Sequence, residues 1–172
     1  ESVQNALTES TILVTIQHAN SEVGTLQNID KIGGCVRQKG ILFHTDAVQS
    51  VGKMAVDVNS LPIDLLSISS HKIYGPKGVG ALFVRRGTPA LFSPVCGGGQ
   101  EKKRRGGTEN IPGIVGFSKA CQLAKEHIFR GELERLRKMR DRLWERIEEL
   151  VPNVEVFGCV NRCLPNTLNC GF

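Results

Sequence analysis

The sequence predicts an α/β protein. It consists of part of a large domain with a mainly parallel sheet, joined to the start of a smaller C-terminal unit. Short apolar runs rich in β-branched residues alternate with helix-length segments over the first half of the chain, which indicates crossover connections between parallel strands. From Pro112 onward, long helical repeats replace this alternation. The composition, 40% hydrophobic and 23% charged, is that of a folded globular protein and excludes a disordered one.

The first predicted strand covers residues 11–17 (TILVTIQ). A helix follows, because Asn28 suits the N-cap position and the apolar residues from Ile29 to Val36 recur at helical spacing. Gly40 ends this helix. Three further apolar runs predict strands, with a helical or irregular stretch between the first and the second of them: residues 41–44 (ILFH), 65–69 (LLSIS) and 80–84 (GALFV).

Two helices are predicted after Pro112, and the second repeats leucine and isoleucine at three- and four-residue steps from Leu133 to Leu150. A helix packed on its own protein is favoured over a coiled coil, because Arg140 interrupts a repeat that is already short. Pro152 ends the helix, and short strands follow it. We expect two domains, a partial one at residues 1–125 and a truncated one at residues 126–172, although no flexible linker marks the division.

Charge and cysteine content limit the classes of partner. The net charge is +5, but the basic run at residues 102–105 has no interleaved aromatic side chains, so no nucleic acid is expected. No apolar run is long enough for a membrane span, and the six scattered cysteines predict reduced thiols in an intracellular protein, with the cytoplasm favoured over the mitochondrion. Cys159 and Cys163 have a zinc-like spacing, but no histidine lies near them and no metal site is expected.

Polar residues follow the predicted strands, where parallel α/β sheets bind their ligands. Taken alone, Asp46 also suits a helix cap or turn, and Lys72, which precedes a Gly-Pro pair, also suits a solvated turn. Together these residues place a carboxylate, amides, hydroxyls, an imidazole and an amine at one edge of the sheet. They are Asn20, Ser21, Asp46, Gln49, Ser69, His71 and Lys72.

Pyridoxal phosphate (PLP) chemistry needs this assortment of groups. A lysine carries the cofactor as a Schiff base, and an acidic side chain keeps the pyridine nitrogen protonated so that the ring accepts electrons. Small hydroxyl and backbone donors suit the phosphate, while a partly desolvated lysine loses its proton more readily.

Three segments resemble consecutive signatures of the cysteine desulfurase and selenocysteine lyase family, the class V, fold-type I PLP enzymes. They are FHTDAVQSVGKMAVDV, SSHKIYGPKGVGALFVRRG and GGGQEKKRRGGTEN, in the family's order and with its spacing. The resemblance runs from about QHANSEVG to LPNTLNCGF, and it implies removal of sulfur or selenium from cysteine or selenocysteine, leaving alanine.

The resemblance also implies residue roles. Lys72 corresponds to the Schiff-base lysine, which with His71 forms the expected catalytic pair; Asp46 corresponds to the partner of the ring nitrogen and Gln49 to that of the ring hydroxyl. Phosphate contacts are expected from Ser69 and His71. They are also expected from Thr108, which in the family reaches across from the neighbouring subunit and so implies a homodimer.

At Asn20 and Ser21 the family commonly has two adjacent asparagines, and the shorter Ser21 side chain has less reach toward the cofactor. The family's phosphate loop, stacking histidine, nucleophilic cysteine and substrate-binding arginine are expected outside these 172 residues, which begin at Glu1 and end within an apolar run. This chain alone is therefore expected to lack activity.

The partners expected for the full-length enzyme are its amino-acid substrate, a second copy of itself and a sulfur or selenium acceptor protein, without nucleic acid or membrane. Another class V enzyme, such as an aminotransferase or a kynureninase-like lyase, and a short non-catalytic product are the alternatives.

Overall fold

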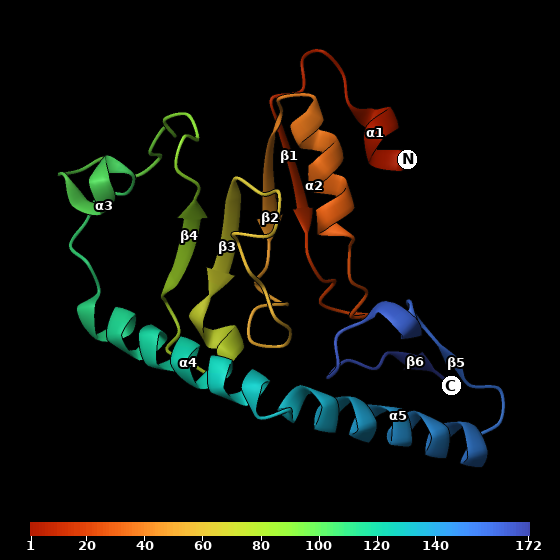
Figure 1. The fold of residues 1–172 in the computed structure, drawn as a ribbon. Coiled ribbons are helices and arrows are strands. Elements are labelled where there is room, and N and C mark those ends of the chain that lie inside the picture. Colours follow the sequence, from red (N-terminus) through yellow and green to blue (C-terminus); the bar gives the residue numbers. More distant parts are fainter.

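The computed structural model describes residues 1–172, and a four-stranded sheet forms its centre (Figure 1). The strands lie side by side in the order in which they occur along the chain. They are β1 (Leu13–Gln17), β2 (Leu42–Asp46), β3 (Leu65–Ser69) and β4 (Gly80–Val84). The expected α/β class with a mainly parallel sheet is confirmed.

The first three strands are parallel, and β4 runs antiparallel to β3. Gln17 pairs with Asp46, and Asp46 pairs with Ser67, so the carboxyl ends of β1, β2 and β3 meet at one edge. The link between β3 and β4 is a single turn of 3-10 helix, η1 (Ser70–Ile73), and a loop. Because a parallel crossover needs a dozen or more residues, this short link returns the chain in the opposite direction.

Helix α2 (Ile29–Gln38) covers one face of the sheet at β1 and β2, and α1 (Ser2–Ala6) packs beside it (Figure 1). The Asn28 side chain accepts a hydrogen bond from the Lys31 N–H, which confirms the predicted N-cap. The main hydrophobic core lies between this helix and the sheet. Its buried residues are Ile29, Val36, Ile41, Phe43, Ala47, Ile63 and Leu66.

Two long helices, α4 (Ile111–Phe129) and α5 (Glu132–Leu150), follow the short helix α3 (Gln100–Lys103) and run end to end past the carboxyl edge of the sheet (Figure 1). A second, smaller core joins α4 to η1 through Ile73, Phe117 and Ala120. Helix α4 therefore supports the turn that contains Lys72. The expected domain division after residue 125 lies within α4, and we retain that division as a proposal.

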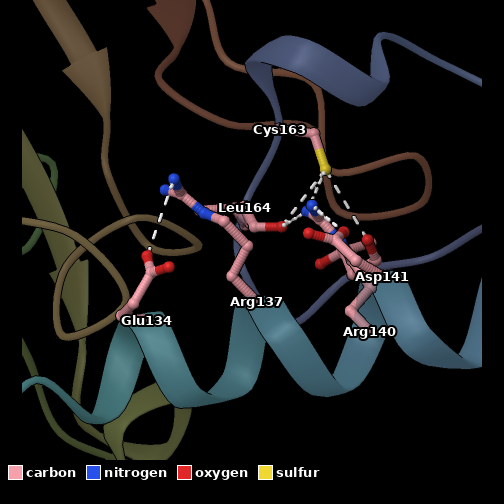
Figure 2. A network of polar contacts seen from close by, with 7 residues as sticks. Glu134, Arg137, Arg140, Asp141, Cys163 and Leu164 are labelled. Atoms are coloured by element: carbon pink, nitrogen blue, oxygen red, sulfur yellow. Dashed lines mark hydrogen bonds and ion pairs between the residues drawn. The ribbon is translucent and has the colours of Figure 1, made fainter.

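The C-terminal segment folds back onto α5 and contains η2 (Val160–Arg162) and the short antiparallel pair β5 (Glu155–Val156) and β6 (Cys170–Gly171). Arg140, whose side chain is only 10% exposed, fixes this segment (Figure 2). Its guanidinium donates to the Leu164 carbonyl at 2.9 Å and contacts Cys163 Sγ at 3.1 Å, while Asp141 accepts from the same group. The arginine that interrupts the helical repeat is thus an anchor for the segment that follows. None of the helices combines the length and apolar character that crossing a membrane requires.

Candidate active site

Lys72 lies in η1, directly after the carboxyl end of β3. The turn is held by backbone hydrogen bonds: the Ser70 N–H donates to the Val79 carbonyl, and the Gly75 N–H donates to the Ser70 carbonyl. Tyr74 ends the turn in the left-handed region at φ 65°, and this residue is 98% exposed. The position of Lys72 is therefore fixed by main-chain structure.

Ser69 precedes this turn and His71 lies within it, and Ser69 Oγ and His71 Nδ1 are 2.9 Å apart. Both side chains reach the same edge of the sheet from the end of β3. A hydroxyl and an imidazole N–H side by side are suitable donors for a phosphate.

Asp46 is the last residue of β2, so the strand extends two residues beyond its predicted end at His44. The strand extends because Thr45 and Asp46 continue the pairing with β1. One carboxylate oxygen, Oδ1, accepts the Val48 N–H at 2.9 Å, and Oδ2 has no hydrogen bond within the chain. Asp46 thus caps the following turn and still has an oxygen for a ligand.

The turn after β2 contains Gln49, and two contacts fix its position. Buried His18 places Nδ1 3.0 Å from Ser50 Oγ, and the Lys53 ammonium group donates to Gln49 Oε1 at 2.9 Å. Burial lowers the pKa of His18 below its ordinary value, so the ring is held neutral. The amide nitrogen of Gln49 has no partner within the chain.

Lys53 and Lys72 line one cavity of about 450 Å³ between the sheet edge, α4, α5 and the segment at Pro165. Burial, followed by the charge of Lys72, lowers the pKa of Lys53. Two amines from different turns therefore face the same space.

The turn after β1 contains Asn20 and Ser21. Asn20 Oδ1 accepts the N–H groups of Glu22 and Val23 at 2.8 and 3.0 Å, so its oxygen is used to build the turn. Ser21 is exposed, and its hydroxyl donates to the Glu22 carboxylate at 3.0 Å. The structure thus leaves Asn20 with a free amide nitrogen and directs Ser21 toward its neighbour in sequence.

Thr108 is separate from these residues. It is exposed in the segment between α3 and α4, and its hydroxyl makes no hydrogen bond within the chain. The single chain therefore groups the residues at the ends of β1, β2 and β3 and leaves Thr108 outside that group.

Three residues of this region were not identified from the sequence: His18, His44 and Lys53. His44 Nδ1 lies 2.6 Å from Thr15 Oγ1 and Nε2 lies 2.8 Å from Ser67 Oγ, which links three neighbouring strands. Burial lowers the pKa of His44, and the carboxylate of Asp46 opposes this effect. The alternation of a strand places His44 and Asp46 on one face, and this signal was available in the sequence.

The donor set fits PLP. Asp46 offers an acceptor for a protonated ring nitrogen, Gln49 an amide donor, Ser69 and His71 donors for the phosphate, and Lys72 an amine. No group of three or more His, Cys, Asp or Glu side chains is arranged to hold a metal ion.

The chain is similar to known proteins over its whole length. The family model described as aminotransferase class-V matches residues 1–172. The chain is 47% identical over 173 residues to a cysteine desulfurase of Trichormus azollae, and the match covers 100% of this chain and 42% of that relative. The chain thus spans less than half the length of the curated relative it matches.

Solved structures give the same result. A NifS-like protein superposes with a TM-score of 0.92 at 37% identity, covering 99% of this chain and 46% of that one. SspA in complex with cysteine superposes with a TM-score of 0.77 at 36% identity, covering 99% of this chain and 46% of that one.

Proposed function

Because the chain belongs to the aminotransferase class-V family, we propose that the full-length protein is a PLP-dependent cysteine desulfurase. The main observation behind the proposal is that five residues suited to PLP lie at or just after the carboxyl ends of β2 and β3. They are Asp46, Gln49, Ser69, His71 and Lys72. Similarity to a cysteine desulfurase and to SspA in complex with cysteine supports cysteine as the substrate. Selenocysteine, in which selenium replaces sulfur, is the second candidate substrate.

The reaction converts cysteine and an enzyme thiol into alanine and an enzyme persulfide. Sulfur passes from the substrate to the enzyme thiol, and no external oxidant is needed. When bound, PLP supplies a carbonyl carbon for amine attachment and a ring that accepts electrons from the substrate. Asp46 would hold the ring nitrogen in its protonated form through the carboxylate oxygen that has no protein partner.

Lys72 would hold the cofactor in the resting enzyme and then move the proton at the substrate α-carbon. Backbone hydrogen bonds hold the turn that carries Lys72 at the same edge of the sheet as Asp46. Ser69 and His71 would bind the phosphate. Thr108, exposed and without a partner in its own chain, would contact the phosphate in a neighbouring subunit, and the site would then require a homodimer.

The test measures products of the full-length protein incubated with PLP and cysteine. We expect alanine and, with added reductant, sulfide in equal amounts, and no turnover in Lys72→Ala. Lys77→Ala is the matched control, because Lys77 is an exposed lysine just beyond the same turn. Borohydride reduction of the loaded protein should add the cofactor's mass to the peptide that contains Lys72.

Two results would contradict the proposal. A label on Lys53 or Lys77 would show that the lysine is wrongly assigned. Release of a keto acid from an amino donor, without alanine from cysteine, would instead identify an aminotransferase of the same family.

A further inference from the structure

We propose that Lys53 is a positioning residue that orients the side-chain amide of Gln49 toward the cofactor. The inference deepens the proposed function and rests on it. The contact is the hydrogen bond from Lys53 Nζ to Gln49 Oε1, 2.9 Å long and partly buried.

The chemistry of the two groups determines the orientation of the amide. The lysine ammonium group has three N–H donors and no lone pair that could accept a hydrogen bond. The Gln49 atom that faces it is therefore the oxygen, because the amide nitrogen is itself a donor. With Oε1 bound to Lys53, Gln49 can offer only its NH₂ group to any other partner.

The orientation matters because of the ligand on the other side. The ring hydroxyl oxygen of PLP needs a donor when it is deprotonated, and an amide turned the other way would place an oxygen against it. Lys53 thus selects the useful one of two amide orientations that are nearly equal in shape.

Neighbouring packing fixes Lys53 in turn. Gly52 has φ +79°, and its backbone lies against Ile73, the residue after Lys72. Lys53 and Lys72 line the same cavity. The turn with Lys53 and Gln49 is therefore packed against the turn with Lys72.

The test uses the full-length protein loaded with PLP and two variants of Lys53. Lys53→Met removes the donor and keeps similar length, whereas Lys53→Arg keeps a donor. Lys39→Met is the control, because Lys39 is exposed at the C-terminal end of α2, away from the carboxyl edge of the sheet. The visible absorption of the bound cofactor is followed over the pH range in which it changes colour, and half-saturation by PLP is measured.

We expect Lys53→Met to raise the spectral midpoint by about half to one pH unit, the size of one ordinary hydrogen bond. Without Lys53 the Gln49 amide can turn its oxygen toward the ring hydroxyl, and the deprotonated hydroxyl then loses its donor. Half-saturation should rise about threefold or more for the same reason. Lys53→Arg should restore most of both values, and Lys39→Met should equal the wild type. A Lys53→Met midpoint equal to that of the wild type would overturn the inference.

A second measurement needs no cofactor. The side-chain amide signals of Gln49 in the unloaded, ¹⁵N-labelled protein, identified by their loss in Gln49→Glu, should shift in Lys53→Met and not in Lys39→Met. Unshifted signals would overturn the inference even if Lys53→Met fails to load. If the wild type takes up no PLP, the proposed function fails, and the amide signals still decide the contact.

Discussion

Replacing Gly52 with alanine tests how closely the turn after β2 packs against the turn that contains Lys72. A Cβ at Gly52 would lie 2.6 Å from Ile73 Cγ2 and 3.3 Å from Ala124 Cβ, at φ +79°. The left-handed backbone costs a non-glycine residue about 1–2 kcal/mol, and overpacking adds about 1–3 kcal/mol. We expect Gly52→Ala to lower the free energy of unfolding by about 2–5 kcal/mol in total.

Gly40→Ala separates the two effects. Gly40 has φ +67°, and a Cβ there would meet nothing within 4 Å, so this variant has the backbone strain without the clash. Urea unfolding of the full-length protein, followed by far-ultraviolet circular dichroism, gives the difference between the variants, which we expect to be about 1–3 kcal/mol. Adding Ile73→Ala to both should remove most of that difference.

Equal losses in the free energy of unfolding for Gly52→Ala and Gly40→Ala would refute the reasoning, because the clash with Ile73 would then not affect stability. Cofactor loading provides a second check. Since Ile73 adjoins Lys72, Gly52→Ala should load less PLP than Gly40→Ala at the same concentration.

Three further predictions follow from the site and its supports. Asp46→Ala should still load PLP but slow alanine formation by orders of magnitude, because the ring nitrogen loses its carboxylate; turnover near the wild-type rate would exclude that role. The lowered pKa of His18 means that the unfolded chain binds more protons, so this contribution to stability is complete above pH 6.5, the ordinary histidine value, and is lost as the pH falls below it. His18→Gln should show a smaller loss of thermal stability on acidification than the wild type, and equal losses would contradict the assignment. Arg140→Met should lower the free energy of unfolding by about 1.5–3 kcal/mol through loss of a charged donor to the buried Leu164 carbonyl; Arg142→Met, at an exposed position on the same helix, is the control and should change it little.

The sequence predicted strands β3 and β4 with the correct bounds, because each is a short apolar run between turn-forming residues. That β4 is antiparallel was not predicted, although the link between β3 and β4 is too short for a parallel crossover. The predicted end of β2 at His44 was wrong, because the strand continues to Asp46. Aspartate favours turns, but pairing of Asp46 with Gln17 and Ser67 keeps it in the ladder.

The positions of Asp46, Gln49 and Lys72 near the carboxyl ends of β2 and β3 were predictable, because these residues follow apolar runs in the sequence. The supporting contacts were not. His18, which follows β1, contacts Ser50 in the turn after β2, and Lys53 contacts Gln49 within an irregular turn that has no periodicity. Arg140 looked like a break in a helical repeat, and two of its partners, Cys163 and Leu164, lie in a segment that follows α5.

The direct return of β4 alongside β3 bears on the order of folding. Ser69 pairs with Gly80 across a short loop, whereas Leu13 meets Leu42 only after the whole of α2 has been traversed. Closing the shorter loop costs less entropy, so we expect β3, the turn with Lys72 and β4 to assemble first. The pairing of β1 with β2 then forms in a later, long-range step. Pulse-labelled hydrogen exchange should protect the amides of β4 before those of β1, and the reverse order would show that the parallel strands nucleate folding.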